Sequence, residues 1–93
     1  MSELLSEASI KEKISSLTDW DKIGKSLRRT KKLENFVEAI AFVNKLVEPA
    51  EVANHHPDIS ISYNKVTINL TTHDAGGLTQ KDFDMAKVIS QIE

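Results

Sequence analysis

Two runs of alternating apolar and polar residues, joined by a short polar turn, most constrain the fold of this chain. The runs cover residues 59–63 and 66–70, and their apolar members are Ile59, Ile61, Tyr63, Val66, Ile68 and Leu70. Side chains two residues apart on a strand share one face, so each run predicts a half-buried strand. Asn64-Lys65 lies between the runs, and asparagine tolerates the left-handed backbone of a two-residue turn. We therefore expect a β-hairpin with one face packed on a core.

Helical patterns and a second strand pair account for the rest of the chain. An amphipathic pattern over residues 3–17 predicts the first helix. Asn35, with Glu38 three residues later, resembles a capping box and predicts a helix that runs to about Ala53. The other predicted elements are a strand at Asp19–Ile23, a turn at Gly24, a strand at Leu27–Leu33, and a last helix capped by Thr79 that runs to Ile92. This order, αββαββα, predicts an α+β fold in which helices pack on a sheet.

The length of 93 residues predicts one domain, residues 1–93. A composition of 40% hydrophobic and 28% charged residues is typical of a folded globular chain. A domain this small buries only about 60 to 65% of the surface of its unfolded chain. A shared subunit interface would bury more of it, so we expect an oligomer.

Charge and cysteine content exclude several classes of protein. A formal net charge of −2 argues against general electrostatic binding to nucleic acid or to an anionic membrane. The chain has no cysteine, which excludes disulfides, thiolate metal sites and a cysteine nucleophile. Neither a signal peptide nor a run of about 20 apolar residues is present, so we expect a cytoplasmic protein.

Two local features resemble binding motifs. Six cations fall within eleven residues, namely Lys22, Lys25, Arg28, Arg29, Lys31 and Lys32. No aromatic residue interleaves with them, so a solvent-facing strand surface is favoured over a base-stacking platform. Gly76-Gly77 precedes the last helix, but the pair lacks the flanking pattern of a phosphate loop and predicts a turn.

All three histidines lie between residues 55 and 73. If Asn64 and Lys65 form the turn, the cross-strand count places His56 opposite His73, and directly opposed residues have β-carbons about 4.5 to 5.5 Å apart. His55 comes from the adjoining helix end. We therefore expect the three imidazoles to meet where the long helix stops, one strand starts and its partner finishes.

Three uses of such a cluster are open. An imidazole has an ordinary pKa of about 6.5 and exchanges a proton at cellular pH, which suits general acid and base chemistry. Three neutral imidazoles would also make a catalytic zinc site, with Glu51 or Asp82 as hydrogen-bond partners of the ligands. The third use is structural: His55-His56-Pro57 would mark only the end of a helix followed by a strand, with no chemical role for the imidazoles.

Three segments closely resemble the pterin-4a-carbinolamine dehydratase family. They are Glu51–Asp58, which contains His-His-Pro, the turn Tyr63–Val66, and Leu70–Thr79, which contains Thr-His. The resemblance is dense from about Glu51 to Ile92. Before that it is scattered, at Trp20, Leu27, Leu33 and Phe36.

The resemblance implies an activity and an architecture. That family dehydrates 4a-hydroxytetrahydropterin, which pterin-dependent aromatic amino acid hydroxylases produce, to quinonoid dihydropterin and water, and it uses no metal and no cofactor. The resemblance also implies a four-stranded antiparallel sheet with helices on one face and a homodimer or homotetramer. It implies a role in pterin recycling alongside a hydroxylase. By motif, His55, His56 and His73 are the catalytic residues. We expect His55 and His73 to exchange protons at the hydroxyl, and His56 to hold the ring or take the other proton.

Further side chains are expected to bind the substrate: Glu51, Asn54, Thr71, Thr72, Asp74 and Asp82. Glu51 lies four residues before His55, so its carboxylate is placed to orient that imidazole or to reach the pterin. A helix-capping role explains Asp82 as well.

Three positions differ from the animal members of the family. Asn54 replaces an aspartate, Ile59 a tryptophan and Lys31 an aromatic residue. The change at Asn54 removes a negative charge beside the histidines, and it affects the expected rate rather than the type of reaction.

Two other functions are alternatives, the first implied by the resemblance and the second by the histidines. Animal relatives also serve as dimerisation cofactors of a transcription factor, so a non-enzymatic interaction protein is one alternative. A metal-dependent hydrolase or oxygenase built on the three histidines is the other.

Overall fold

The computed structural model describes residues 3–92 of the chain. Its elements in order are α1 (Glu7–Ile14), β1 (Asp21–Ile23), β2 (Ser26–Lys32), α2 (Phe36–Asn44), α3 (Val47–Ala53), β3 (Asp58–Ser62), β4 (Lys65–Leu70), the 3-10 turn η1 (His73–Ala75) and α4 (Gln80–Ser90). This is the predicted order with the central helix divided in two. Within the described residues, no helix has the length and apolar character needed to cross a membrane.

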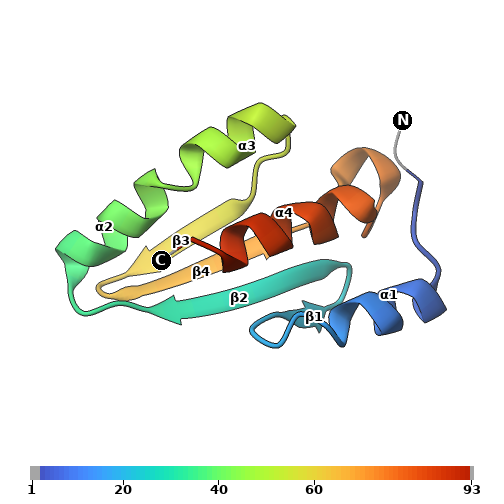
Figure 1. Ribbon diagram of the computed structural model, residues 1–93, viewed down its shortest axis with the longest axis horizontal. Helices are drawn as coiled ribbons and strands as arrows, with labels where there is room; N and C mark the ends of the chain where they lie inside the picture. The colour runs from blue at the N-terminus through green and yellow to red at the C-terminus, as the bar shows by residue number, and fades with distance from the viewer. Residues whose placement is uncertain (1–2, 93) are drawn as a thin grey trace.

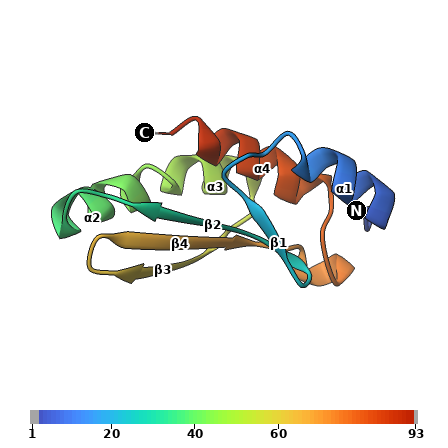
Figure 2. The ribbon, with the colours of Figure 1, turned by 90° about the horizontal axis from the view of Figure 1, so that it is seen from below.

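The four strands form one antiparallel sheet in the order β1-β2-β4-β3. In Figure 1, α4 lies over the sheet and the α2–α3 pair runs along its β3 edge, and Figure 2 shows the helices on one side of the sheet. The predicted α+β fold, with an antiparallel sheet covered by helices on one face, is therefore confirmed.

The core lies between the sheet and the helices. Val66, Ile68 and Leu70 alternate along β4 and are 0% exposed, while the residues between them are half-buried. Phe42 of α2 and Phe83 of α4 are buried in the same core. Full burial of each such side chain contributes roughly 1.5–3 kcal/mol. The alternation that predicted a one-sided strand thus holds along β4.

The turn of the β3–β4 hairpin is formed by Tyr63 and Asn64, and the predicted turn at Asn64-Lys65 is wrong by one residue. Every cross-strand pair is shifted by two residues in consequence. Ile59 lies opposite Ile68, for example, rather than opposite the next inward-facing residue of β4. Because side chains repeat every two residues, the shift leaves the predicted faces unchanged.

A contact with the end of β2 explains this register. The Asn64 side-chain amide donates to the Leu33 carbonyl at 3.0 Å, and the Leu33 N–H donates to the Asn64 carbonyl at 2.7 Å. These bonds hold Asn64 against β2, and Tyr63 takes the left-handed backbone, with φ of 53°. A tertiary contact therefore places the turn one residue earlier than the sequence pattern predicts.

The predicted continuous helix from Asn35 to about Ala53 is wrong at Lys45–Leu46, where α2 and α3 separate. Its start is correct, because the Asn35 side chain accepts a hydrogen bond from the Glu38 N–H at 2.9 Å. Pro49 explains the break, since it has no N–H for the carbonyl four residues earlier and its ring clashes with that carbonyl. In α3, Pro49 lies in the first turn, where N–H groups have no partner within the helix.

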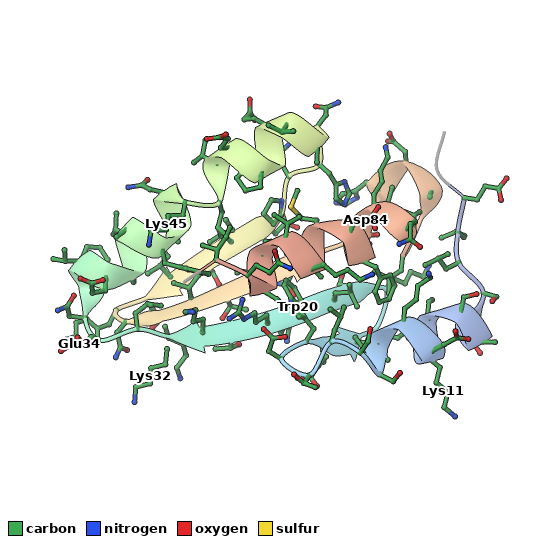
Figure 3. All side chains as sticks on the ribbon, viewed as in Figure 1. Lys11, Trp20, Lys32, Glu34, Lys45 and Asp84 are labelled. Carbon is green, nitrogen blue, oxygen red and sulfur yellow. The ribbon has the colours of Figure 1, made fainter. Side chains whose placement is uncertain are left out.

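The remaining elements differ from prediction at their ends. α1 has 8 residues, fewer than the predicted span of 3–17, and is capped by Ser6, whose hydroxyl accepts from the Ser9 N–H. β1 begins two residues later than predicted because Trp20 turns inward, where its indole N–H donates to the Ser90 hydroxyl at 2.8 Å (Figure 3). β2 begins and ends one residue earlier than predicted.

Four of the six basic residues between positions 22 and 32 are exposed, as predicted. Arg29 and Lys31 are half-buried instead, because alternate residues of β2 face the helices. The Arg29 guanidinium contacts Asp19 at 3.1 Å, and the Lys31 ammonium lies 5.0 Å from the centre of the Phe42 ring. The predicted solvent-facing position is wrong for these two side chains.

Candidate functional site

His55 and His56 lie in the link between α3 and β3, and the end of α3 determines where this link begins. Asn54 ends the helix in the left-handed conformation, with φ of 50° and ψ of 43°. Asparagine adopts this conformation more readily than most residues. The two imidazoles that follow contact carboxylates on different elements.

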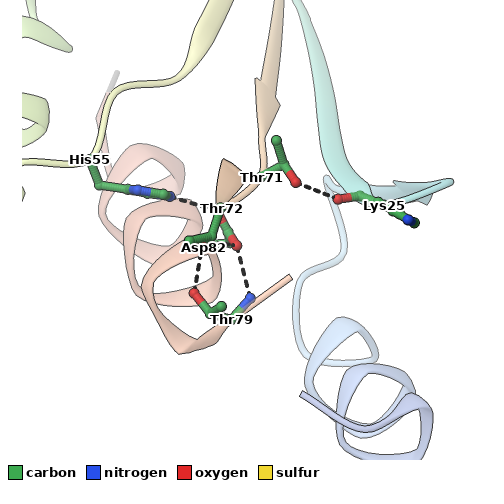
Figure 4. A network of polar contacts seen from close by, with 6 residues as sticks. All are labelled: Lys25, His55, Thr71, Thr72, Thr79 and Asp82. Atoms are coloured by element: carbon green, nitrogen blue, oxygen red, sulfur yellow. Dashed lines mark hydrogen bonds and ion pairs between the residues drawn. The ribbon is translucent and has the colours of Figure 1, made fainter. Parts of the chain in front are cut away.

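The His55 imidazole contacts a buried carboxylate. Its Nε2 lies 2.6 Å from Oδ1 of Asp82, which is 0% exposed, and the His55 side chain itself is 11% exposed. The other oxygen of Asp82, Oδ2, accepts from the Thr72 hydroxyl at 2.8 Å and from the Thr79 N–H at 2.9 Å (Figure 4). Asp82 is thus both the predicted cap of α4 and the partner of a site histidine.

The His56 imidazole contacts Glu51 through Nε2 at the surface. The His56 side chain is 57% exposed and the Glu51 side chain is 67% exposed. The expectation that Glu51 orients His55 is therefore wrong, because its carboxylate lies against the next histidine. A pair this exposed is screened by solvent and holds its partners weakly.

His73 is exposed and begins η1, directly after Thr72, whose hydroxyl contacts Asp82. β3 begins after His56 and β4 ends before His73, so neither is part of the paired strands. The predicted opposition of His56 and His73 is wrong as a result of the register shift. His55 and His56 precede β3 and His73 follows β4, so all three residues lie at the same end of this strand pair.

A cleft of about 740 Å³ opens between α3 and α4 beside His55. Its apolar wall includes Pro49, Val52, Met85 and Val88, and charged residues such as Lys45 and Asp84 also line it (Figure 3). Small-molecule pockets typically measure about 300–1,000 Å³ and are mostly apolar with a few polar groups. This cleft therefore has the size and lining expected for a bicyclic ligand.

A smaller cavity of about 280 Å³ lies beside His56. Glu51, Pro57 and Ile59 are among the residues that line it. His56 thus borders a second hollow, next in the chain to the histidine that borders the larger one.

The other predicted binding residues have varied surroundings. The Thr71 hydroxyl donates to the Lys25 carbonyl at 2.7 Å and ties the end of β4 to the β1–β2 turn. Asn54 and Asp74 are exposed on the two connections that carry the histidines. The Thr72 hydroxyl is buried and contacts Asp82 and Thr79.

The apolar wall of the larger cleft was not predicted from the sequence. It includes Val52 and Val88, which are 81% and 45% exposed on α3 and α4. The contact of Thr79 with Thr72 was also missed, since it depends on how the β4–α4 connection folds.

Within residues 3–92, no group of three or more histidine, aspartate or glutamate side chains is arranged to hold a metal ion. His55 contacts Asp82 and His56 contacts Glu51, so the two imidazoles lie against different carboxylates.

Comparison with known proteins gives one consistent result. The family described as Pterin 4 alpha carbinolamine dehydratase matches residues 3–92. Relatives from Trichormus variabilis and Cyanothece sp. carry the name pterin-4-alpha-carbinolamine dehydratase. The first is 64% identical over 99% of this chain and 99% of its own length, and the second is 63% identical over 99% and 95%.

A solved structure agrees with these relatives. The crystal structure of a transcriptional coactivator/pterin dehydratase from Brucella melitensis superposes with a TM-score of 0.87 and 31% identity, over 92% of this chain and 94% of that one. The chain therefore belongs to the pterin 4 alpha carbinolamine dehydratase family, a family of hydro-lyases.

Proposed function

We propose that this protein dehydrates 4a-hydroxytetrahydropterin to quinonoid dihydropterin and water. The observation that carries the proposal is the His55 imidazole, which a buried carboxylate holds at the wall of a cleft large enough for a pterin. Membership of the family supplies the substrate class. We propose that the reaction occurs in the cytoplasm as a step of pterin recycling, after an aromatic amino acid hydroxylase has formed the carbinolamine.

The reaction needs one acid and one base. The bond between C4a and the hydroxyl oxygen breaks as that oxygen takes a proton and leaves as water. The N5 proton is removed, and the electron pair of the N5–H bond stays on N5 and allows the new double bond between N5 and C4a to form. His55 and His73 deliver the proton to the hydroxyl on its two possible faces, and His56 holds the ring or takes the N5 proton.

Polar side chains near the histidines bind the edge of the pterin in this proposal. Glu51, Asn54 and Asp74 are exposed and able to meet a ligand. Asp82 holds His55 and does not contact the pterin itself, since both of its oxygens accept hydrogen bonds from protein groups.

Single substitutions of the three histidines test the mechanism. His55→Ala, His56→Ala and His73→Ala should each lower turnover by roughly 10² to 10⁴-fold, because each removes a proton-transfer or holding group. Turnover is measured as carbinolamine loss in a coupled hydroxylase assay. Lys65→Ala, at the exposed start of β4, is the control and should keep the wild-type rate. Wild-type turnover in all three histidine variants would reject the assignment.

We propose a homodimer or homotetramer as the working form. Several apolar side chains of α2 and α3 are exposed, namely Phe36 at 51%, Val37 at 73%, Val47 at 58% and Val52 at 81%. Burial of this surface in a second copy would add to a small core. Sedimentation velocity of the whole chain should give a mass of two or four copies.

A second candidate is an interaction role in transcription, because the Brucella melitensis structure carries the name coactivator as well as dehydratase. A His55→Ala, His73→Ala double variant separates the two roles in cells. A phenotype that survives this loss of dehydration would favour the interaction role, and a phenotype lost with it favours the enzyme.

A further inference from the structure

The hydrogen bonds around Asp82 determine which atoms carry protons. A carboxylate only accepts hydrogen bonds, so Thr72, at 2.8 Å from Oδ2, must donate its single hydroxyl proton to it. The contact of 2.8 Å between the Thr72 and Thr79 hydroxyls then has Thr79 as the donor. With the Thr79 N–H, two donors meet Oδ2, and Oδ1 accepts from His55.

This arrangement assigns the tautomer of His55. Because Oδ1 of Asp82 accepts, Nε2 of His55 carries a hydrogen, and in the neutral ring Nδ1 carries none. Among residues 3–92, no hydrogen bond to Nδ1 is found, and every buried side-chain nitrogen or oxygen has a partner. Nδ1 of His55 is therefore not buried, and the His55 ring lines the cleft between α3 and α4.

We propose that Nδ1 is the atom of His55 that exchanges a proton with the substrate, and that Asp82 and Thr72 are positioning residues that keep Nε2 protonated. The proposal rests on the dehydratase function for its substrate. The protonated ring delivers its Nδ1 proton to the departing hydroxyl, and the neutral ring that remains keeps its Nε2 hydrogen bond to Asp82.

Thr72 therefore acts differently from the neighbouring polar residues. Its buried hydroxyl links the Thr79 hydroxyl to Asp82 and is not available to the pterin. Its substitution should change how well the His55 ring is held rather than how tightly the substrate binds.

The tautomer is measured directly by imidazole nitrogen NMR on the whole chain labelled with ¹⁵N-histidine, without substrate. With the rings neutral, the resonances of His55, identified by their loss in His55→Ala, should show a protonated Nε2 and a bare Nδ1. A bare Nε2 in the wild-type protein would overturn the proposal. The measurement needs no turnover, so it decides the tautomer even if the dehydratase function fails.

Asp82→Asn reverses the prediction in a side chain of the same shape. If the amide nitrogen faces His55, it donates to Nε2 and moves the ring hydrogen to Nδ1. The neutral His55 of this variant should therefore show a protonated Nδ1, and turnover should fall by roughly 10² to 10⁴-fold. An unchanged tautomer together with unchanged turnover would contradict the role of Asp82.

Thr72→Val and Thr72→Ser test the hydroxyl. Thr72→Val should lower kcat by roughly 10- to 100-fold with little change in KM, by analogy with the loss of hydrogen-bond partners that orient metal-bound histidines. Thr72→Ser keeps the hydroxyl and should have the wild-type kcat. The matched control is Thr67→Val, on the face of β4 that points away from the core, and it should also have the wild-type kcat. Thr72→Val with wild-type kcat, or Thr72→Ser as impaired as Thr72→Val, would remove Thr72 from the account.

Discussion

Two carboxylate–imidazole pairs of the site differ in burial. Asp82 is fully buried and accepts bonds from His55, Thr72 and Thr79, whereas Glu51 and His56 meet at the surface. Removal of one partner from a buried network leaves the others without hydrogen bonds, which costs far more than loss of an exposed ion pair. The two pairs therefore contribute differently to stability.

We expect Asp82→Ala to lower the free energy of unfolding by roughly 1–3 kcal/mol for each buried donor that loses its acceptor, namely the Thr79 N–H and the Thr72 hydroxyl. Glu51→Ala should lower it by less than about 1 kcal/mol, the range of exposed ion pairs. Urea unfolding of both variants measures the difference. Equal losses would contradict the division into a buried and a surface pair.

Among the elements, the β3–β4 hairpin positions the connections that carry the histidines. Ser60 lies opposite Thr67 in the observed register, whereas the turn at Asn64-Lys65 would place it opposite Asn69. Directly opposed antiparallel residues have Cα atoms about 4.5 to 5.5 Å apart, within the range that a disulfide bridges, and diagonal neighbours are about 7 to 8 Å apart.

The pair Ser60→Cys and Thr67→Cys should therefore form a disulfide on mild oxidation. The pair Ser60→Cys and Asn69→Cys should remain mostly reduced. Thiol titration and mass measurement of each double variant give the result. Preferential oxidation of the second pair would contradict the register.

Much of the element pattern could be predicted from local signals. The alternation around Ile68 identified the buried face of β4, and Asn35 and Thr79 marked the starts of two helices. The hairpin register could not be predicted, because it depends on the contact of Asn64 with Leu33, 31 residues earlier in the chain. Pro49 is a local signal for the break before α3, but the amphipathic pattern on both sides of it predicted one continuous helix.

Part of the site was also predictable from local signals. Motif spacing identified the histidines, and the capping position of Asp82 followed from Thr79. The contact of His55 with Asp82 depends on how α3 and α4 pack together, and this packing leaves no local trace in the sequence.

For the whole molecule, stability depends on the single layer between the sheet and the helices. Ile68→Ala should lower the free energy of unfolding by roughly 2–5 kcal/mol, since the side chain is 0% exposed at the centre of that layer. Thr67→Ala, the adjacent residue on the other face of β4, should change it by less than about 0.5 kcal/mol. A large loss in both variants would mean that the sheet is covered on both faces.

The same layer explains how so short a chain presents a reactive group beside a cleft. α3 and α4 lie on one face of the sheet, and residues of both helices line the cleft that His55 borders. The loss of carbinolamine generated by an aromatic amino acid hydroxylase, followed with and without this protein, tests the central claim most directly. The account predicts an acceleration that His55→Ala largely abolishes, and a rate no faster than spontaneous dehydration would contradict it.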